Sequence, residues 1–134
     1  MKKLPLIHPG LSEVIASMGV GDRLVIANAM LAIPPEIRRI DLALTKGIPS
    51  LEDTLRVILT EMCVEEAVVA EEMIEDHPHI FEAVQELLGE VAIKSVLHVA
   101  LKQQTKLAQC IIRTGEYAPY ANIILFSGEW DPES

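Results

Sequence analysis

Hydrophobic and polar positions along the chain follow two alternating patterns, one typical of helices and one typical of buried strands. Stretches in which apolar residues recur at spacings of three and four predict helices that begin near residues 11, 51, 78 and 98. Short continuous apolar runs lie between them and predict strands at residues 24–27, 37–42, 64–70, 91–95 and 122–126. Because strands separated by helices form parallel βαβ units, we expect an α/β fold with a largely parallel sheet covered by helices.

Residues that cap or stop helices mark the ends of several predicted helices. Gly19 is placed to end the first, and Pro78 opens the third. Ser50 is expected to cap the second, whose apolar stripe comprises Leu51, Leu55, Ile58, Leu59 and Met62. The last helix is predicted at about residues 98–113, before Gly115, with one side formed by Leu101, Thr105, Ala108 and Ile112.

Composition narrows the class of protein. The 134 residues are enough for one domain, residues 1–134, and no repeat or linker divides them. Half of the chain is hydrophobic, but it holds only one Trp, two Tyr and two Phe, so the core must be aliphatic. With 11 basic and 20 acidic residues, the net charge of −9 would repel a phosphate backbone or an anionic membrane surface. We therefore expect neither nucleic acid nor membrane as a partner.

The cellular location and the state of the cysteines can be predicted from local features of the sequence. Uncharged stretches such as residues 24–35 are much shorter than the roughly 20 apolar residues that span a bilayer. Two prolines and a histidine at residues 5–9 interrupt any export signal, so the predicted location is the cytoplasm. Cys63 and Cys110 lie far apart without metal-ligand spacing, which favours buried free thiols.

Common cofactor motifs are not found in the sequence. Residues 19–22 begin like a dinucleotide-binding fingerprint, but Leu24 takes the place of the third glycine and the segment leads into a strand rather than a helix. Neither a GxxxxGK(S/T) phosphate loop nor a GxSxG elbow occurs. His77 and His79 form at most a weak chelating pair, and such residues beside a proline at a helix start are more often solvated. We expect no cofactor and no metal.

Polar side chains gather at the ends of the predicted strands, where parallel α/β folds place ligand sites. They are Asn28, Asp41, His98, Glu116, Tyr117, Tyr120 and Asn122. Each alone has an ordinary structural explanation, such as a turn amide, a solvated carboxylate or a core aromatic. Together they supply hydroxyl, amide, imidazole and carboxylate groups, which can hydrogen-bond the hydroxyls of a sugar.

Six segments read, in chain order, MGVGD, LVIANA, RIDLALTKGIPS, TEMCVEEAVVAEE, LKQQT and RTGEYAPYANIIL. Together they resemble the family of D-ribose pyranases and L-fucose mutarotases (RbsD/FucU). The likeness extends over nearly the whole chain and is weakest at about residues 77–97. The RIDLALTKGIPS stretch and the PYANIIL end are its most specific parts.

The resemblance implies an RbsD-like fold that assembles into pentameric rings stacked as decamers, with active sites between neighbouring subunits. It implies cofactor-free ring opening and reclosure of an aldose, which interconverts pyranose with furanose or one anomer with the other, in carbohydrate metabolism. This reaction requires one group to protonate the ring oxygen while another takes the anomeric hydroxyl proton. The resemblance places His98 at the substrate-binding histidine, and Tyr120 and Asn122 in the sugar-contacting loop.

Two positions depart from the family pattern. The catalytic acid of the family is a histidine at the position of Val20, which has no proton to give. A sugar-binding aspartate is replaced by Asn28, which keeps a hydrogen-bonding shape without the charge. Three hypotheses stay open: a mutarotase in which His98 moves the proton with Asp22 or a water helping, a catalytically silent sugar-binding or regulatory paralogue, and a protein selective for another ligand or isomerisation.

Overall fold

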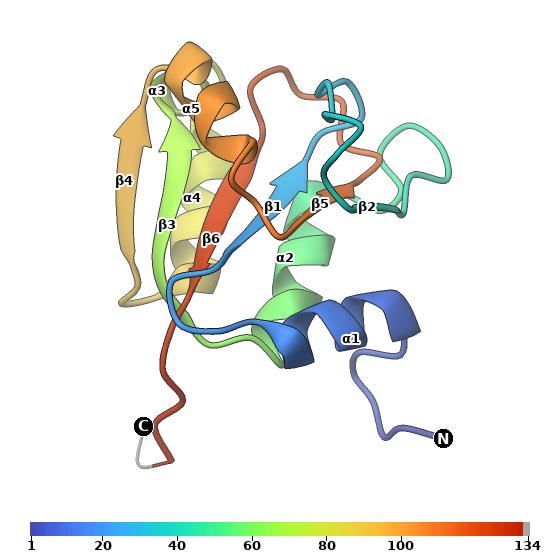
Figure 1. Ribbon diagram of the computed structural model, residues 1–134. Helices are drawn as coiled ribbons and strands as arrows, with labels where there is room; N and C mark the ends of the chain where they lie inside the picture. The colour runs from blue at the N-terminus through green and yellow to red at the C-terminus, as the bar shows by residue number, and fades with distance from the viewer. Residues whose placement is uncertain (133–134) are drawn as a thin grey trace.

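The computed structural model describes residues 1–132. Six strands in these residues form one sheet in the order β2-β5-β1-β6-β3-β4 (Figure 1). Their bounds are β1 Arg23–Ala27, β2 Arg39–Asp41, β3 Val64–Ala70, β4 Ala92–Val96, β5 Cys110–Arg113 and β6 Ile123–Ser127. Strand β6 runs antiparallel to its neighbours β1 and β3, while the other three pairings are parallel. The predicted α/β fold with a largely parallel sheet is confirmed, with β6 as the exception.

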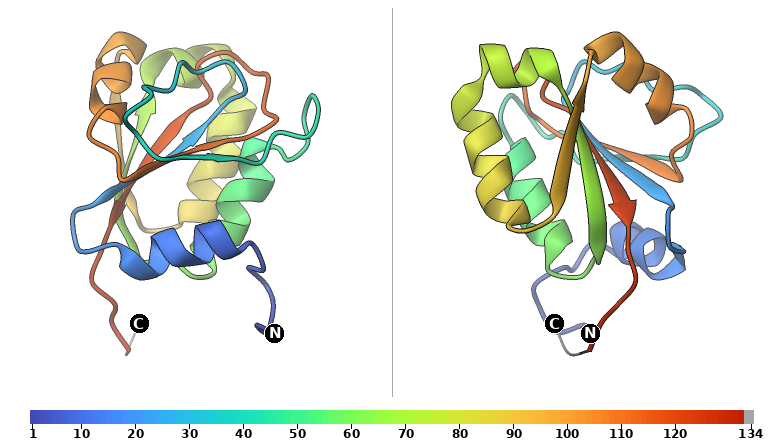
Figure 2. Two further views of the ribbon diagram at one scale, coloured as in Figure 1. Left: turned by 45° about the vertical axis from the view of Figure 1, so that its right-hand side comes forward. Right: turned by 90° about the vertical axis from the view of Figure 1, so that its left-hand side faces the viewer.

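Helices cover both faces of the sheet. They are α1 Pro9–Ser17, α2 Leu51–Leu59, α3 Glu71–Asp76, α4 Pro78–Leu88 and α5 His98–Thr105. Helices α2, α3 and α4 lie on one face and α5 lies on the other (Figure 2). Helix α1 lies near the end of the sheet where β1 begins, whereas α5 and the loops that follow β1 and β5 lie near the opposite end (Figure 1). That opposite end holds the polar residues identified from the sequence.

Helix α2 shows how local sequence determines the fold. The Ser50 hydroxyl accepts a hydrogen bond from the Asp53 N–H at 3.0 Å, which satisfies one of the unpaired donors of the first turn. Acidic residues in the first turn and Arg56 in the last complement the helix dipole. The apolar stripe is buried through Leu51, Leu55 and Ile58. The predicted cap is confirmed, and so is the stripe through Ile58, but the helix ends at Leu59 and Met62 lies beyond it.

One prediction of secondary structure is wrong, and one helix was missed. Helix α5 ends at Thr105, and Cys110–Arg113 form strand β5 rather than the end of a long helix. This strand pairs with β1 on one side and β2 on the other, so its apolar run is buried in the sheet. The short helix α3, before Pro78, was not predicted. For residues 110–113, pairing with two neighbouring strands outweighs the helical spacing of a few apolar residues.

The core is aliphatic, as composition predicts. Its largest fully buried side chains belong to the strands and to helices α2, α3 and α5: Leu24, Ile26, Leu51, Leu55, Ile58, Met73, Leu101, Ile111, Ile112, Ile123, Ile124 and Leu125. Each such side chain contributes about 1.5–3 kcal/mol through burial. Cys110 joins this core as a free thiol, and burial raises the pKa of its thiol to about 11, while Cys63 is free and partly exposed. Within residues 1–132, no helix is long and apolar enough to cross a membrane.

Candidate functional site

The structure brings Asn28, His98, Tyr120 and Asn122 together around one cavity of about 300 Å³. The cavity lies where β1 ends and β6 begins, beside α5. Its other lining residues are Met30, Leu31, Ala32, Lys102 and Pro119. The lining therefore combines polar and apolar side chains. Small-molecule sites in proteins combine these two kinds of surface, the polar groups fixing the orientation of the ligand.

The antiparallel pairing of β1 and β6 places Asn28 next to Asn122. The Asn28 N–H donates to Oδ1 of Asn122 at 2.8 Å, and both residues are buried. Nδ2 of Asn122 is buried without a hydrogen-bond partner in the described residues. Leaving such a donor unpaired costs about 1–3 kcal/mol. Because Asn122 lines the cavity, this nitrogen is a candidate donor to a ligand there.

His98 begins α5 and directs a half-buried imidazole to the same cavity. Its ring meets the Tyr120 ring edge-on, with centroids 5.0 Å apart, and its Nδ1 is buried without a partner in the described residues. The pKa of His98 lies below its usual value, mainly because burial disfavours the charged imidazolium. The Glu72 carboxylate raises this pKa, and the positive charge of Lys102 lowers it. A neutral imidazole has one N–H to donate and one nitrogen that accepts.

Tyr120 has an unusual backbone conformation. Its φ of 66° is the only positive value among the non-glycine residues that the structure describes. This region costs a bulky L-residue roughly 1–3 kcal/mol and persists only where the surroundings fix it. Hydrogen bonds from the Asn122 N–H to the Tyr120 carbonyl at 2.9 Å and from the Ala121 N–H to the Ala118 carbonyl at 3.3 Å hold the turn. The turn sets the Tyr120 ring against His98.

Asn28 uses its side chain mainly within the protein. Its Oδ1 accepts from the Met30 N–H and its Nδ2 donates to the Ala118 carbonyl, both at 3.1 Å. The amide thus connects the loop after β1 with the loop that carries Tyr120. One further N–H and one further lone pair stay available on the amide. Its role as a sugar ligand stays a prediction.

Glu116 stabilises the Tyr120 loop from the other side. Its carboxylate accepts from the N–H groups of Tyr117 and Ala118, at 3.2 and 3.3 Å, and from the Leu51 N–H at the start of α2, at 3.2 Å. It joins the first turn of a core helix to the loop beside the cavity. Sequence reasoning noted Glu116 only as one of several polar residues near the last strand. Nothing in the sequence indicates its contact with Leu51, 65 residues away.

Asp22 and Val20 do not reach this cavity within one chain. Both lie in the turn before β1, where Oδ2 of Asp22 accepts from the Gly19 N–H at 2.8 Å and Val20 is 65% exposed. Asn28 lies beyond the other end of the strand, about 20 Å away for six extended residues. A catalytic part for Asp22, or a position of Val20 in the site, requires a neighbouring copy of the chain. Both stay predictions.

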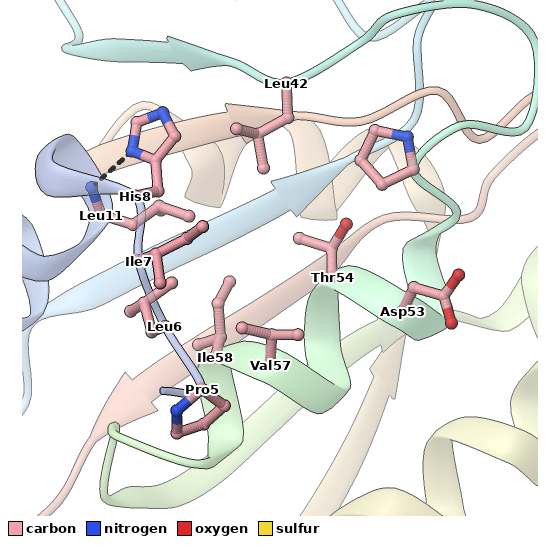
Figure 3. A pocket seen from close by; sticks show the side chains of 11 residues that line it. Pro5, Leu6, Ile7, His8, Leu11, Leu42, Asp53, Thr54, Val57 and Ile58 are labelled. Atoms are coloured by element: carbon pink, nitrogen blue, oxygen red, sulfur yellow. Dashed lines mark hydrogen bonds between the residues drawn. The ribbon is translucent and has the colours of Figure 1, made fainter. Parts of the chain in front are cut away.

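A second cavity, of about 290 Å³, lies between the N-terminal segment, α1 and α2 (Figure 3). Its lining is mostly aliphatic, with Leu6, Ile7, Leu11, Leu42, Val57 and Ile58. The imidazole of His8 turns toward α1, where its Nδ1 accepts from the Leu11 N–H at 3.1 Å and caps the helix. With few polar groups, this cavity suits a sugar less well than the cavity at His98. Within residues 1–132, His, Cys, Asp and Glu side chains form no group of three or more that could hold a metal ion.

Comparisons with known proteins show a family for this chain. The chain matches the RbsD / FucU transport protein family over residues 1–129. It is 55% identical to a D-ribose pyranase from Coprothermobacter proteolyticus and 51% identical to one from Chloroflexus aggregans, in each case over 96% of this chain and 98% of the relative.

Solved structures show the same likeness. Bacillus subtilis RbsD complexed with D-ribose has a TM-score of 0.94 and 37% identity, covering 98% of this chain and 100% of that one. The fucose mutarotase from Streptococcus pneumoniae in complex with L-fucose has a TM-score of 0.75 and 25% identity, covering 93% and 95%. The resemblance found in the sequence is thus confirmed, and the chain belongs to the RbsD / FucU family.

Proposed function

We propose that the chain binds a monosaccharide in the cavity at His98 and interconverts its ring forms or anomers without a cofactor, as an isomerase of the D-ribose pyranase type. The observation that supports this best is that His98 and Asn122 line one cavity beside Tyr120, and that each has a buried nitrogen without a hydrogen-bond partner in residues 1–132. Relatives that are 55% and 51% identical to the chain are named D-ribose pyranase. Their names favour a pentose as the substrate.

The chemistry requires a proton to leave the anomeric hydroxyl and another to reach the ring oxygen. In this proposal a neutral His98 takes the first proton, and its imidazolium, or a water that it polarises, returns one to the ring oxygen. Asn122 donates a hydrogen bond from Nδ2 to a sugar hydroxyl, and Tyr120 lies beside the sugar ring. Asp22 of a neighbouring copy is the second candidate for the proton transfer.

A second candidate function is sugar binding without turnover, as in a regulatory paralogue. The observation that favours it is Val20, which has no titratable group at the position where the resemblance implies the family acid. The internal hydrogen bonds of Asn28 point the same way, because they leave less of this side chain for a substrate. The two functions differ in exchange between anomers, not in affinity.

Anomeric exchange measured by magnetisation transfer on D-ribose distinguishes these functions. We expect exchange faster than in buffer, and we expect His98→Ala to lower the rate toward that of buffer, by about 10²–10⁴-fold if His98 supplies the acid–base assistance. His79→Ala, which removes an exposed histidine from α4, is the matched control and should leave exchange unchanged. Ribose binding without added exchange would favour the silent paralogue, and neither binding nor exchange for any aldose would contradict both functions.

We also propose that the working unit is a homo-oligomer, a decamer of pentameric rings, located in the cytoplasm. The positions of Val20 and Asp22, at the end of β1 remote from the cavity, favour a site shared between copies. Three exposed apolar residues near the cavity, Met30, Leu97 and Val99, suit burial against such a neighbour.

Light scattering tests the assembly directly. We expect a mass near ten times 14.8 kDa at micromolar concentration. Met30→Glu and Val99→Glu should reduce this mass, since a charge buried at an interface is costly. A species of 14.8 kDa in the wild type would contradict the assembly and the shared site together.

A further inference from the structure

The first turn of α5 is held by a residue from another helix. Leu97, the N-cap residue of α5, makes no side-chain capping bond. Instead, the His98 N–H donates to both carboxylate oxygens of Glu72 in α3, at 2.9 and 3.1 Å. Hydrogen bonds to a charged acceptor are stronger than neutral ones, and a carboxylate at a helix N-terminus is also favoured by the helix dipole. Glu72 therefore replaces the missing local cap.

This contact fixes the position of the His98 backbone. The backbone of His98 is the point from which the ring extends to the cavity. Within residues 1–132, the buried Nδ1 has no hydrogen bond that could orient the ring by itself. The ring also packs edge-on against Tyr120. Glu72 is thus the hydrogen-bonded anchor of the residue that the proposed reaction depends on.

The charge of Glu72 acts on the same imidazole. The groups around His98 are Glu72 from α3, Lys102 from α5 itself and Tyr120 from the loop before β6. Burial lowers the pKa of His98, the negative charge of Glu72 raises it, and the positive charge of Lys102 lowers it. Of these influences, Glu72 is the one that favours the imidazolium.

We propose that Glu72 is a positioning residue for His98, which holds the start of α5 at the cavity and balances the positive charge that the imidazole acquires when it takes a proton. This inference rests on the proposed function, because it assigns Glu72 a part in the same proton transfer. A purely structural cap would act through the backbone alone. A charge-balancing residue also shifts the titration of the ring, which can be measured without any sugar.

Glu72→Gln separates the two effects. Glutamine keeps one oxygen to accept from the His98 N–H but removes the charge. We expect the ligand-free, assembled variant to show a lower pKa of His98 than the wild type, read from the ¹³Cε1 signal that His98→Ala removes from the four histidine signals. The pH profile of anomeric exchange should move to lower pH in the same variant.

Two further variants complete the test. Glu71→Gln alters the exposed neighbour on the same helix and should titrate like the wild type. Glu72→Asp keeps the charge on a shorter side chain, so its His98 pKa should lie closer to the wild type than that of Glu72→Gln. Identical titration in the wild type, Glu72→Gln and Glu72→Asp overturns the inference, even when ribose exchange is intact. Absence of ribose exchange in the wild type would instead contradict the proposed function.

Discussion

Gly115→Ala is expected to abolish the folded protein. A Cβ at residue 115 would lie 2.5 Å from the Thr45 carbonyl oxygen and 2.6 Å from both the nitrogen and the carbonyl oxygen of Ile48. These are backbone atoms, so no side-chain rotation relieves the overlap. The two segments also cannot separate freely, because the Gly115 N–H donates to the Pro49 carbonyl at 2.8 Å and the Gly47 N–H donates to the Gly115 carbonyl at 2.6 Å.

The expected cost exceeds about 4 kcal/mol, a large part of the stability of a small domain. It should appear as loss of soluble, assembled protein, or as a lower urea midpoint if the variant is recovered. Gly19→Ala is the matched control, since its Cβ would meet only an ordinary contact at 3.7 Å from Oδ2 of Asp22. We expect its free energy of unfolding to change by no more than about 0.5 kcal/mol. A wild-type midpoint for Gly115→Ala would show that the two segments are not packed as described.

The role of Gly115 shows where sequence reasoning succeeds and where it fails. The helical periodicity before it predicts a helix that this glycine ends, but the glycine follows β5 and lets two backbone segments approach closely. Strand β5 depends on pairing with β1, where Cys110 lies beside Leu24 from a distant part of the chain. A window of ten residues contains no information on that pairing. Helix α2, by contrast, has its cap Ser50 and its buried stripe within the same window, and its prediction is confirmed.

In the candidate site, too, some residues were predictable from the sequence and others were not. Polar residues at strand ends were predictable, because the carboxyl ends of parallel strands form one edge of the sheet. That rule identified Asn28 and His98, and the loop before the last strand added Tyr120 and Asn122. The anchoring carboxylates of Glu72 and Glu116 were not predicted as such. Each contacts a backbone N–H far along the chain, 26 residues away for Glu72 and 65 for Glu116.

Val20→His is expected to raise anomeric exchange by about 10²–10⁴-fold for at least one aldose, the range that general acid–base assistance supplies. The resemblance to the pyranase family implies a histidine acid at this position, and valine there has no proton to transfer. Because Val20 is 65% exposed in the single chain, a larger polar side chain meets no packed core. We therefore expect the unfolding midpoint to stay near that of the wild type, so that the rate reports chemistry rather than folding.

The matched control is Val20→Gln, a polar side chain of similar length without a group that titrates near neutral pH. Exchange should rise in Val20→His but not in Val20→Gln. The pH profile of exchange in Val20→His should also show the titration of the new imidazole. Adding Asn28→Asp restores a carboxylate but places an oxygen where Nδ2 now donates to the Ala118 carbonyl, so the gain from the charge is opposed by repulsion in the Tyr120 loop. Equal exchange rates in Val20→His and Val20→Gln, with ribose bound as tightly as by the wild type, would mean that no neighbouring copy brings this turn to the cavity. His98 and its own surroundings would then have to supply the whole of any catalysis.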